Sequence, residues 1–258
     1  MKYFVPQEAS KYEVPSVFGP KDYLTYARSL GLFNGFPIPT SAIMVFDHHV
    51  YHALKKEHPG QETRAFFRLH VLEKDRNQIG ICGGFGIGAP AAVIAMEELI
   101  ALGVRSIVAV GTSGSLQKDL RIGSTVLPNQ AIRDEGTSHH YVPGTRFASP
   151  SPDLLGRLRR TLNASQRSFR EGAVWTTDAP YRETRGEVEK LQNEGVLAVE
   201  MEASALFTVG TYRKAEVAAL LNVSDDLSHL RWNPQLHDSE RQTHLIELSE
   251  IALEVLRS

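Results

Sequence analysis

The chain has 258 residues, of which 42% are hydrophobic and 22% are charged, and its formal net charge is -2. These values are typical of a globular protein and exclude a disordered, collagen-like or coiled-coil chain. Lysine and arginine are scattered without a basic excess, so we expect no nucleic-acid polymer as a partner. No apolar run resembles a signal peptide or a membrane span, so we expect a cytoplasmic protein without a membrane partner.

The single cysteine, Cys82, excludes an internal disulfide, and no Cys/His spacing typical of zinc surrounds it. We therefore expect no metal ion, and we also expect no organic cofactor. Cys82 ends the apolar run 79–82, a pattern that favours a small buried strand residue over a catalytic thiol.

The pattern along the chain predicts an N-terminal arm at residues 1–40 and one α/β domain at residues 41–258. Strands are predicted at 42–46, 79–82, 106–110, 123–128, 172–177, 196–199 and 217–223. Helices are predicted at 21–30, 91–102, 153–163, 187–194, 202–212 and 243–256. Glycine-rich turns are expected at 83–90 and 111–115, and a polar loop at 133–144. This order predicts a central mixed, largely parallel sheet flanked by helices, with ligand loops at the carboxyl ends of its strands.

The turn Gly83–Gly88 follows a strand and precedes a helix. Glycine accepts backbone angles that let several N–H groups approach one anion. The turn lacks the distant acid of a dinucleotide site and the Gly-Lys-Ser/Thr of a P-loop. A tight structural turn explains it as well as ligand binding does.

Two acidic segments follow predicted strands. Glu202 stands at a helix start, where it is either a solvated acid that favours the helix dipole or an acceptor for the two hydroxyls of a ribose. Met201 offers that sugar an apolar contact. Asp225 follows the strand at 217–223, where an acid is most often a turn or cap residue.

Taken together, the spaced motifs resemble the nucleoside phosphorylase family, which includes uridine phosphorylase, the hexameric purine nucleoside phosphorylases and the adenosylhomocysteine nucleosidases. The likeness runs from about Ala42 to the C-terminal helix. Its most specific element is Val-Glu-Met-Glu-Ala at 199–203, supported by 86–90, 111–114 and 224–225. The segments 133–141 and 177–183 are closer to the uridine phosphorylase branch.

The resemblance implies an N-glycosidic phosphorolysis that converts a nucleoside and inorganic phosphate into free base and ribose 1-phosphate. It implies that Glu202 binds the ribose hydroxyls, with Met201 and Glu200 in the same wall. Asp225 would protonate the departing base. We also expect a homo-oligomer, a hexamer or a dimer, whose subunits share their sites.

The same resemblance implies contacts for the remaining site residues. Thr112 would contact phosphate or ribose, while Ser113 and Gly114 would flank the base. Gly86 belongs to the phosphate-side turn. Tyr181 and Arg182 would lie near the base, although Arg182 is as easily a surface residue paired with a glutamate.

Two arginines expected for phosphate are missing. The family's Gly-Asp-Pro-x-Arg reads Phe-Asp-His-His-Val at 46–50 here, and Ala109 replaces an arginine before the second glycine turn. His48, His49, Arg64 and Arg133 are possible replacements, Arg64 in the position of an arginine from a neighbouring subunit. The departures leave purine or pyrimidine preference open. They also leave two alternatives, a phosphate-independent nucleoside hydrolase and a non-catalytic nucleoside-binding protein.

Overall fold

The computed structural model describes residues 8, 10–76, 78–234 and 239–258. Its helices are α1 (Pro20–Ser29), α2 (His48–Glu57), α3 (Ala89–Leu102), α4 (Pro152–Ala164), α5 (Arg185–Asn193), α6 (Ala203–Arg213) and α7 (Ser239–Arg257), with 3-10 turns η1 (Ser138–His140) and η2 (Pro180–Arg182). Its strands are β1 (Ser41–Val45), β2 (Gly60–Arg64), β3 (Arg68–Leu72), β4 (Ile79–Gly83), β5 (Ser106–Ser115), β6 (Thr125–Asp134), β7 (Phe147–Ala148), β8 (Phe169–Thr177), β9 (Ala198–Glu200), β10 (Glu216–Asp226) and β11 (Asn233–Pro234).

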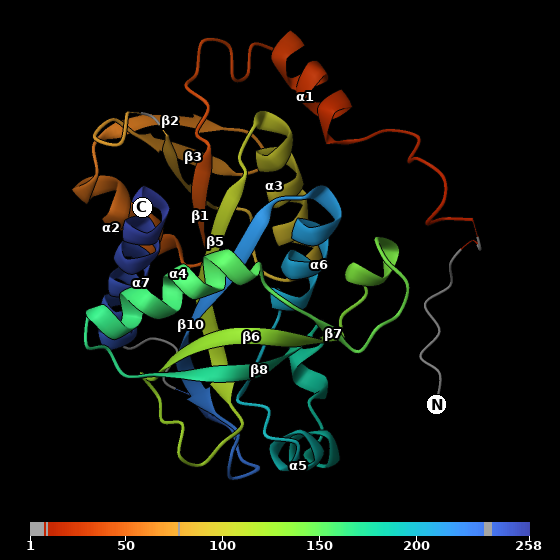
Figure 1. Ribbon diagram of the computed structural model, residues 1–258, viewed down its shortest axis with the longest axis vertical. Coiled ribbons are helices and arrows are strands. Elements are labelled where there is room, and N and C mark those ends of the chain that lie inside the picture. Colours follow the sequence, from red (N-terminus) through yellow and green to blue (C-terminus); the bar gives the residue numbers. More distant parts are fainter. Residues whose placement is uncertain (1–7, 9, 77, 235–238) are drawn as a thin grey trace.

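The described strands join one mixed sheet in the order β11-β10-β6-β8-β9-β5-β1-β4-β3-β2, with β7 beside β6 (Figure 1). Parallel pairing joins β4, β1, β5 and β10, and antiparallel pairing adds β3 and β2 at one edge. Because β10 pairs with both β5 and β6, and β9 with both β5 and β8, these five strands close a ring. The expected single α/β domain with a mixed sheet is confirmed.

Helices cover both faces of the central strands (Figure 1). Side chains alternate along a strand, so Ala42 and Met44 of β1 pack with α1, α3 and α6, while Ile43 and Val45 pack with α2, α4 and α7. All four side chains are buried. The helices on either side leave the carboxyl ends of the strands as the place where polar side chains can gather.

The N-terminal segment contributes to this core. Helix α1 packs on α3, and its Leu24 and Ala27 are buried, while Val17 and Phe18 before it are exposed. The helix begins and ends one residue earlier than the sequence indicates. The division of the chain at residue 40 stays a prediction.

The glycine-rich turn expected at 111–115 is wrong, because β5 continues through Ser115. It pairs there with β10 and β9, and β10 likewise runs through Asp226 instead of ending at residue 223. Gly114 is needed in this strand because neighbouring side chains pack closely against its backbone. A Cβ on Gly114 would lie 2.6 Å from Leu227 Cδ1 and 3.0 Å from Asp225 Oδ2.

The sequence reading also misses α2, β2 and β3. Helix α2 begins after Asp47, whose Oδ1 accepts hydrogen bonds from the backbone N–H of His49 (2.8 Å) and Val50 (3.1 Å). Asp47 is therefore the N-cap of α2. The sequence analysis aligned this segment with the family's Gly-Asp-Pro-x-Arg and did not predict the helix. The expected polar loop at 133–144 is shorter than predicted, because β6 includes Arg133 and Asp134.

Candidate active site

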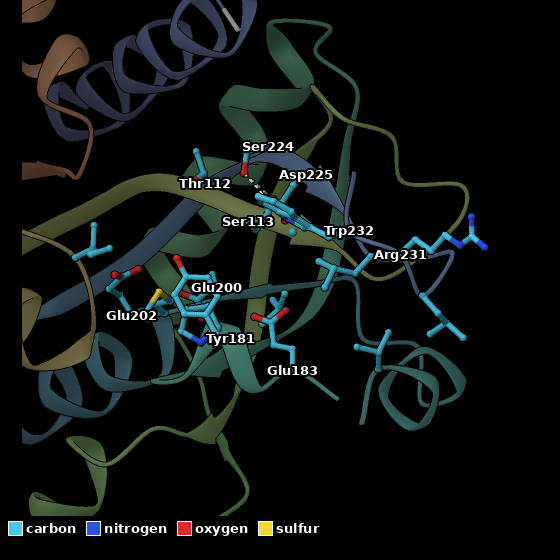
Figure 2. Close-up of a pocket in the computed structure, with 18 of the residues that line it drawn as sticks. Thr112, Ser113, Tyr181, Glu183, Glu200, Glu202, Ser224, Asp225, Arg231 and Trp232 are labelled. Carbon is cyan, nitrogen blue, oxygen red and sulfur yellow. Dashed lines mark hydrogen bonds between the residues drawn. The ribbon is translucent and has the colours of Figure 1, made fainter. Parts of the chain in front are cut away.

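A pocket of about 610 Å³ lies where the carboxyl-terminal parts of β5, β9 and β10 meet η2 and the start of α5. Its volume is in the range of small-molecule sites. Figure 2 shows Glu200 and Glu202 on one side of it and Asp225 and Trp232 on the other, with Glu183 below Asp225. The pocket therefore has two acidic ends.

Most of the site residues expected from the sequence line this one pocket. They are Thr112, Ser113, Gly114, Tyr181, Glu200, Met201, Glu202 and Asp225. Gly86, Arg182, His49 and Arg64 do not line it. Ile87, which follows Gly86, does.

The glycine turn holds Glu202. Gly84, Gly86 and Gly88 have φ values of 71°, 94° and 91°, a region that favours glycine. The backbone N–H of Gly88 donates to Oε1 of Glu202. One N–H of the turn thus binds a side chain of the protein, and this contact links the turn to the carboxylate expected to bind ribose.

Glu200 has a different environment. Its Oε2 accepts hydrogen bonds from the backbone N–H of Glu202 (2.8 Å) and Ala203 (2.7 Å), and the hydroxyl of Thr176 donates to Oε1. Glu200 therefore satisfies N–H groups at the start of α6. Burial raises the pKa of Glu200, against these hydrogen bonds, and burial together with Glu200 raises the pKa of Glu202.

Two hydroxyl groups of β5 stand between the acidic ends. Ser113 is buried, and its Oγ has no hydrogen-bond partner among the described residues. Thr112 is half-buried beside it on the pocket wall. A buried hydroxyl without a partner is uncommon, and its position on the wall of a cavity indicates a place for a ligand atom.

At the other end, Asp225 follows an irregularity in β10 between Val223 and Asp225. Its Oδ1 accepts a hydrogen bond from Ser224 Oγ (2.8 Å), and its Oδ2 accepts one from Trp232 Nε1 (3.1 Å). The bulge turns Asp225 toward the cavity instead of letting it end the strand as a cap, so the turn or cap reading of this residue is wrong.

A family model described as the phosphorylase superfamily matches residues 40–257. The chain belongs to the phosphorylase superfamily. It is 36% identical over 215 residues to DeoD-type purine nucleoside phosphorylases of Bacillus cytotoxicus and Bacillus cereus, covering 76% of this chain and 90% of each relative. The crystal structure of a uridine phosphorylase from Vibrio fischeri matches with a TM-score of 0.71 and 26% identity, covering 85% of this chain and 91% of that one.

This member of the phosphorylase superfamily has an apolar side chain in the first segment where the sequence resemblance implies phosphate ligands. Phe46 lines the pocket, its ring packs edge-on against Phe85 with centroids 5.2 Å apart, and Ala109 is buried. Asp47 pairs with Arg241 of α7 at 3.0 Å. The cationic side chains that line the described pocket are Arg185 and Arg231, and Arg231 points away from the acids in Figure 2.

The proposed replacements for the missing arginines lie elsewhere. His48 and His49 are exposed at the start of α2, and Arg64 is exposed at the end of β2. Arg133 is buried, and its guanidinium binds Ser138 Oγ (2.9 Å) and the carbonyl of Pro143 (3.0 Å). Arg133 therefore stabilises the loop after β6.

Several pocket residues escaped the sequence analysis. Glu183 lies directly after η2, and Trp232 lies in the segment after β10, as do Leu227 and Leu230. Glu183 could have been predicted, because it follows Tyr181 by two residues and Tyr181 was expected near the base. No pattern marked Trp232, because only the return of the chain after β10 brings its indole to Asp225.

Outside the pocket, Glu57, His58 and Glu250 bring possible metal-ligand atoms within 4.8 Å of one another, and His58 Nε2 lies 2.6 Å from Glu250 Oε1. They join α2 to α7, away from the pocket. No described helix is both long and apolar enough to cross a membrane.

Proposed function

We propose that this chain is a nucleoside phosphorylase, which transfers the ribosyl group of a nucleoside to inorganic phosphate without a further cofactor or metal ion. The observation that carries the proposal is the pocket itself, with Met201 and Glu202 at one end and Asp225 at the other. Membership in the phosphorylase superfamily and the names of the similar proteins support it.

The ribose belongs at the Glu202 end. Oε1 of Glu202 accepts the N–H of Gly88, and the carboxyl group lines the pocket, where it can bind the ribose hydroxyls while Met201 packs on the sugar. Cleavage of the glycosidic bond builds positive charge on the ribose and negative charge on the base. The carboxyl group of Glu202 holds the sugar by its hydroxyls while the first of these charges develops.

The phosphate belongs beside Thr112 and Ser113, whose hydroxyl groups can donate to it. The base extends toward Asp225 over Gly114, with Tyr181 at the mouth of the pocket, where it is fully exposed. Gly86 does not line the pocket and contributes through the backbone conformation of the turn that binds Glu202. Arg182 contacts the base only if η2 moves, since it does not line the pocket.

Hydrolysis of the same bond is the second candidate. Phe46 and Ala109 favour it, because they place apolar surface where phosphate arginines are expected. Each charge-assisted contact to an arginine contributes roughly 1.5–3 kcal/mol, so losing two weakens phosphate binding strongly.

Base release with and without phosphate distinguishes the two. We expect inosine or uridine to be cleaved at a rate that rises with phosphate concentration and saturates, with ribose 1-phosphate as the sugar product, measured by chromatography. The control is sulfate at equal ionic strength. Equal rates in both buffers with free ribose as product would establish hydrolysis instead.

We further propose a homo-oligomer in which Arg64 reaches the site of a neighbour. Arg64 is exposed outside its own pocket, and Phe66, two residues later in the connection between β2 and β3, is 43% exposed. Exposed Val17 and Phe18 offer further apolar surface. An arginine supplied this way replaces a missing phosphate ligand.

Mixing of subunits tests this arrangement. Arg64→Ala and Glu202→Ala homo-oligomers should each be nearly inactive, and refolding the two together should restore activity at sites that combine an intact Glu202 with an intact Arg64. The exposed Arg160→Ala chain, mixed with Glu202→Ala, serves as control. A monomer by light scattering that is active in the rate assay contradicts the proposal. Full activity of Arg64→Ala alone contradicts it as well.

A further inference from the structure

The base end of the pocket carries two carboxyl groups, Asp225 and Glu183, in different surroundings. Asp225 accepts two hydrogen bonds, one on each oxygen, from Ser224 and from the indole of Trp232. These two hydrogen bonds hold both oxygens of Asp225 in a fixed orientation, which suits a group that orients a bound base.

Glu183 has the opposite environment. It is half-buried, it lines the pocket, and no described residue donates a hydrogen bond to it. Its acidic neighbours are Asp225 of β10 and Glu187 of α5, and the cations on the same pocket wall are Arg185 and Arg231. Burial, followed by the charges of Asp225 and Glu187, raises the pKa of Glu183 to about 7.

The placement of Glu183 suits a reaction at the base. In Figure 2 the carboxyl group of Glu183 points into the cavity from below Asp225 and Trp232. A base whose ribose is held at Glu202 would end between Glu183 and Asp225. One group there can give a proton while the other holds the edge of the base.

We propose that Glu183 is the general acid that protonates the departing base, and that Asp225 is the carboxylate that orients this base. The proposal rests on the proposed nucleoside phosphorylase function. It transfers to Glu183 the proton-donor role that the sequence resemblance implies for Asp225.

The step balances without a further reactant. A phosphate oxygen forms a bond to C1′ of the ribose as the bond from C1′ to the base nitrogen breaks, and the electron pair of that bond passes to the base. The proton of Glu183 moves to the base, which leaves neutral. Glu183 remains as a carboxylate and regains a proton from water before the next turnover.

The experiment compares leaving groups. For phosphorolysis of inosine, Glu183→Gln should lower kcat about 10²–10⁴-fold, because general-acid assistance typically contributes that much. For 4-nitrophenyl β-D-ribofuranoside, whose phenolate departs without a proton, the same variant should lose less than about tenfold. Glu189→Gln, an exposed acid on the same helix as Glu187, is the matched control and should keep wild-type rates on both substrates.

The pH profile gives a second readout. Glu183 gives its proton only while protonated, so kcat/KM of the wild type on inosine should fall as pH rises through about 7, the pKa to which its surroundings raise it. That basic limb should be absent from Glu183→Gln. Asp225→Asn should keep the limb and raise KM, because it alters an acceptor for the base.

The outcomes separate the two proposals. Wild type that releases no base from any nucleoside overturns the proposed function and this inference with it. Two results with an active wild type overturn the inference alone. One is an equal loss of rate on both substrates in Glu183→Gln. The other is a Glu183→Gln profile whose kcat/KM still falls as pH rises. Circular dichroism and thermal melting of each variant establish that the losses arise in a folded chain.

Discussion

Glu202→Ala should reduce turnover of any nucleoside by about 10²–10³-fold or more while the protein keeps its fold. The carboxylate is the acceptor expected to hold the ribose hydroxyls, and a loss of reactant geometry at a reacting centre costs on this order. Its fold contacts are few. It accepts hydrogen bonds from backbone N–H groups near the pocket, including that of Gly88, and its own helix start is capped by Glu200 instead.

A rate assay beside thermal melting checks this result. The alternative reading, an acid that only favours the dipole of α6, predicts a loss of about 0.3–1 kcal/mol in stability and no loss of activity. Glu189→Ala controls for removal of an exposed acid. Undiminished activity of Glu202→Ala with a melting temperature lowered by a few degrees would establish the dipole reading.

The parts of this fold that were predictable depend on local patterns. Apolar runs such as 79–82 and 217–223 carry strands because buried parallel strands are apolar on both faces. The motif around Met201 was predictable as a strand-to-helix junction because the acids interrupt an apolar strand just before a helix.

The misplaced parts depend on contacts that no short pattern contains. Gly111–Ser115 looks like a turn, yet it is a strand because it pairs with β10 and β9. Its Gly114 is required because Leu227 packs too closely for a Cβ. The pairing of Trp232 with Asp225 depends on the path of the chain after β10. The resemblance places Glu200 and Glu202 in one wall, and both line the pocket. Their hydrogen bonds differ, because Glu200 binds the start of α6 and Glu202 binds the glycine turn.

That difference predicts a second large effect, on stability. Glu200→Ala should lower the free energy of unfolding by about 2–4 kcal/mol, because it removes the acceptor of two backbone N–H groups and of the Thr176 hydroxyl in a buried place. Chemical denaturation measures the loss. Glu202→Ala, at the adjacent position in the motif, is the matched comparison and should lose less than about 1 kcal/mol, the magnitude of one exposed or half-buried contact.

Glu200→Gln separates the hydrogen bonds from the charge. An amide oxygen still accepts from the N–H groups of Glu202 and Ala203, so stability near pH 5 should stay close to that of the wild type. Burial raises the folded-state pKa of Glu200 above its ordinary value of 4.5, so the folded chain binds this proton more tightly than the unfolded chain. Its stabilising contribution is therefore full below that value and is lost as pH rises through the raised pKa. Glu200→Gln lacks this titration and should become more stable relative to the wild type as pH rises; a constant difference between the two proteins from pH 5 to pH 8 would mean that Glu200 stays ionised in the fold.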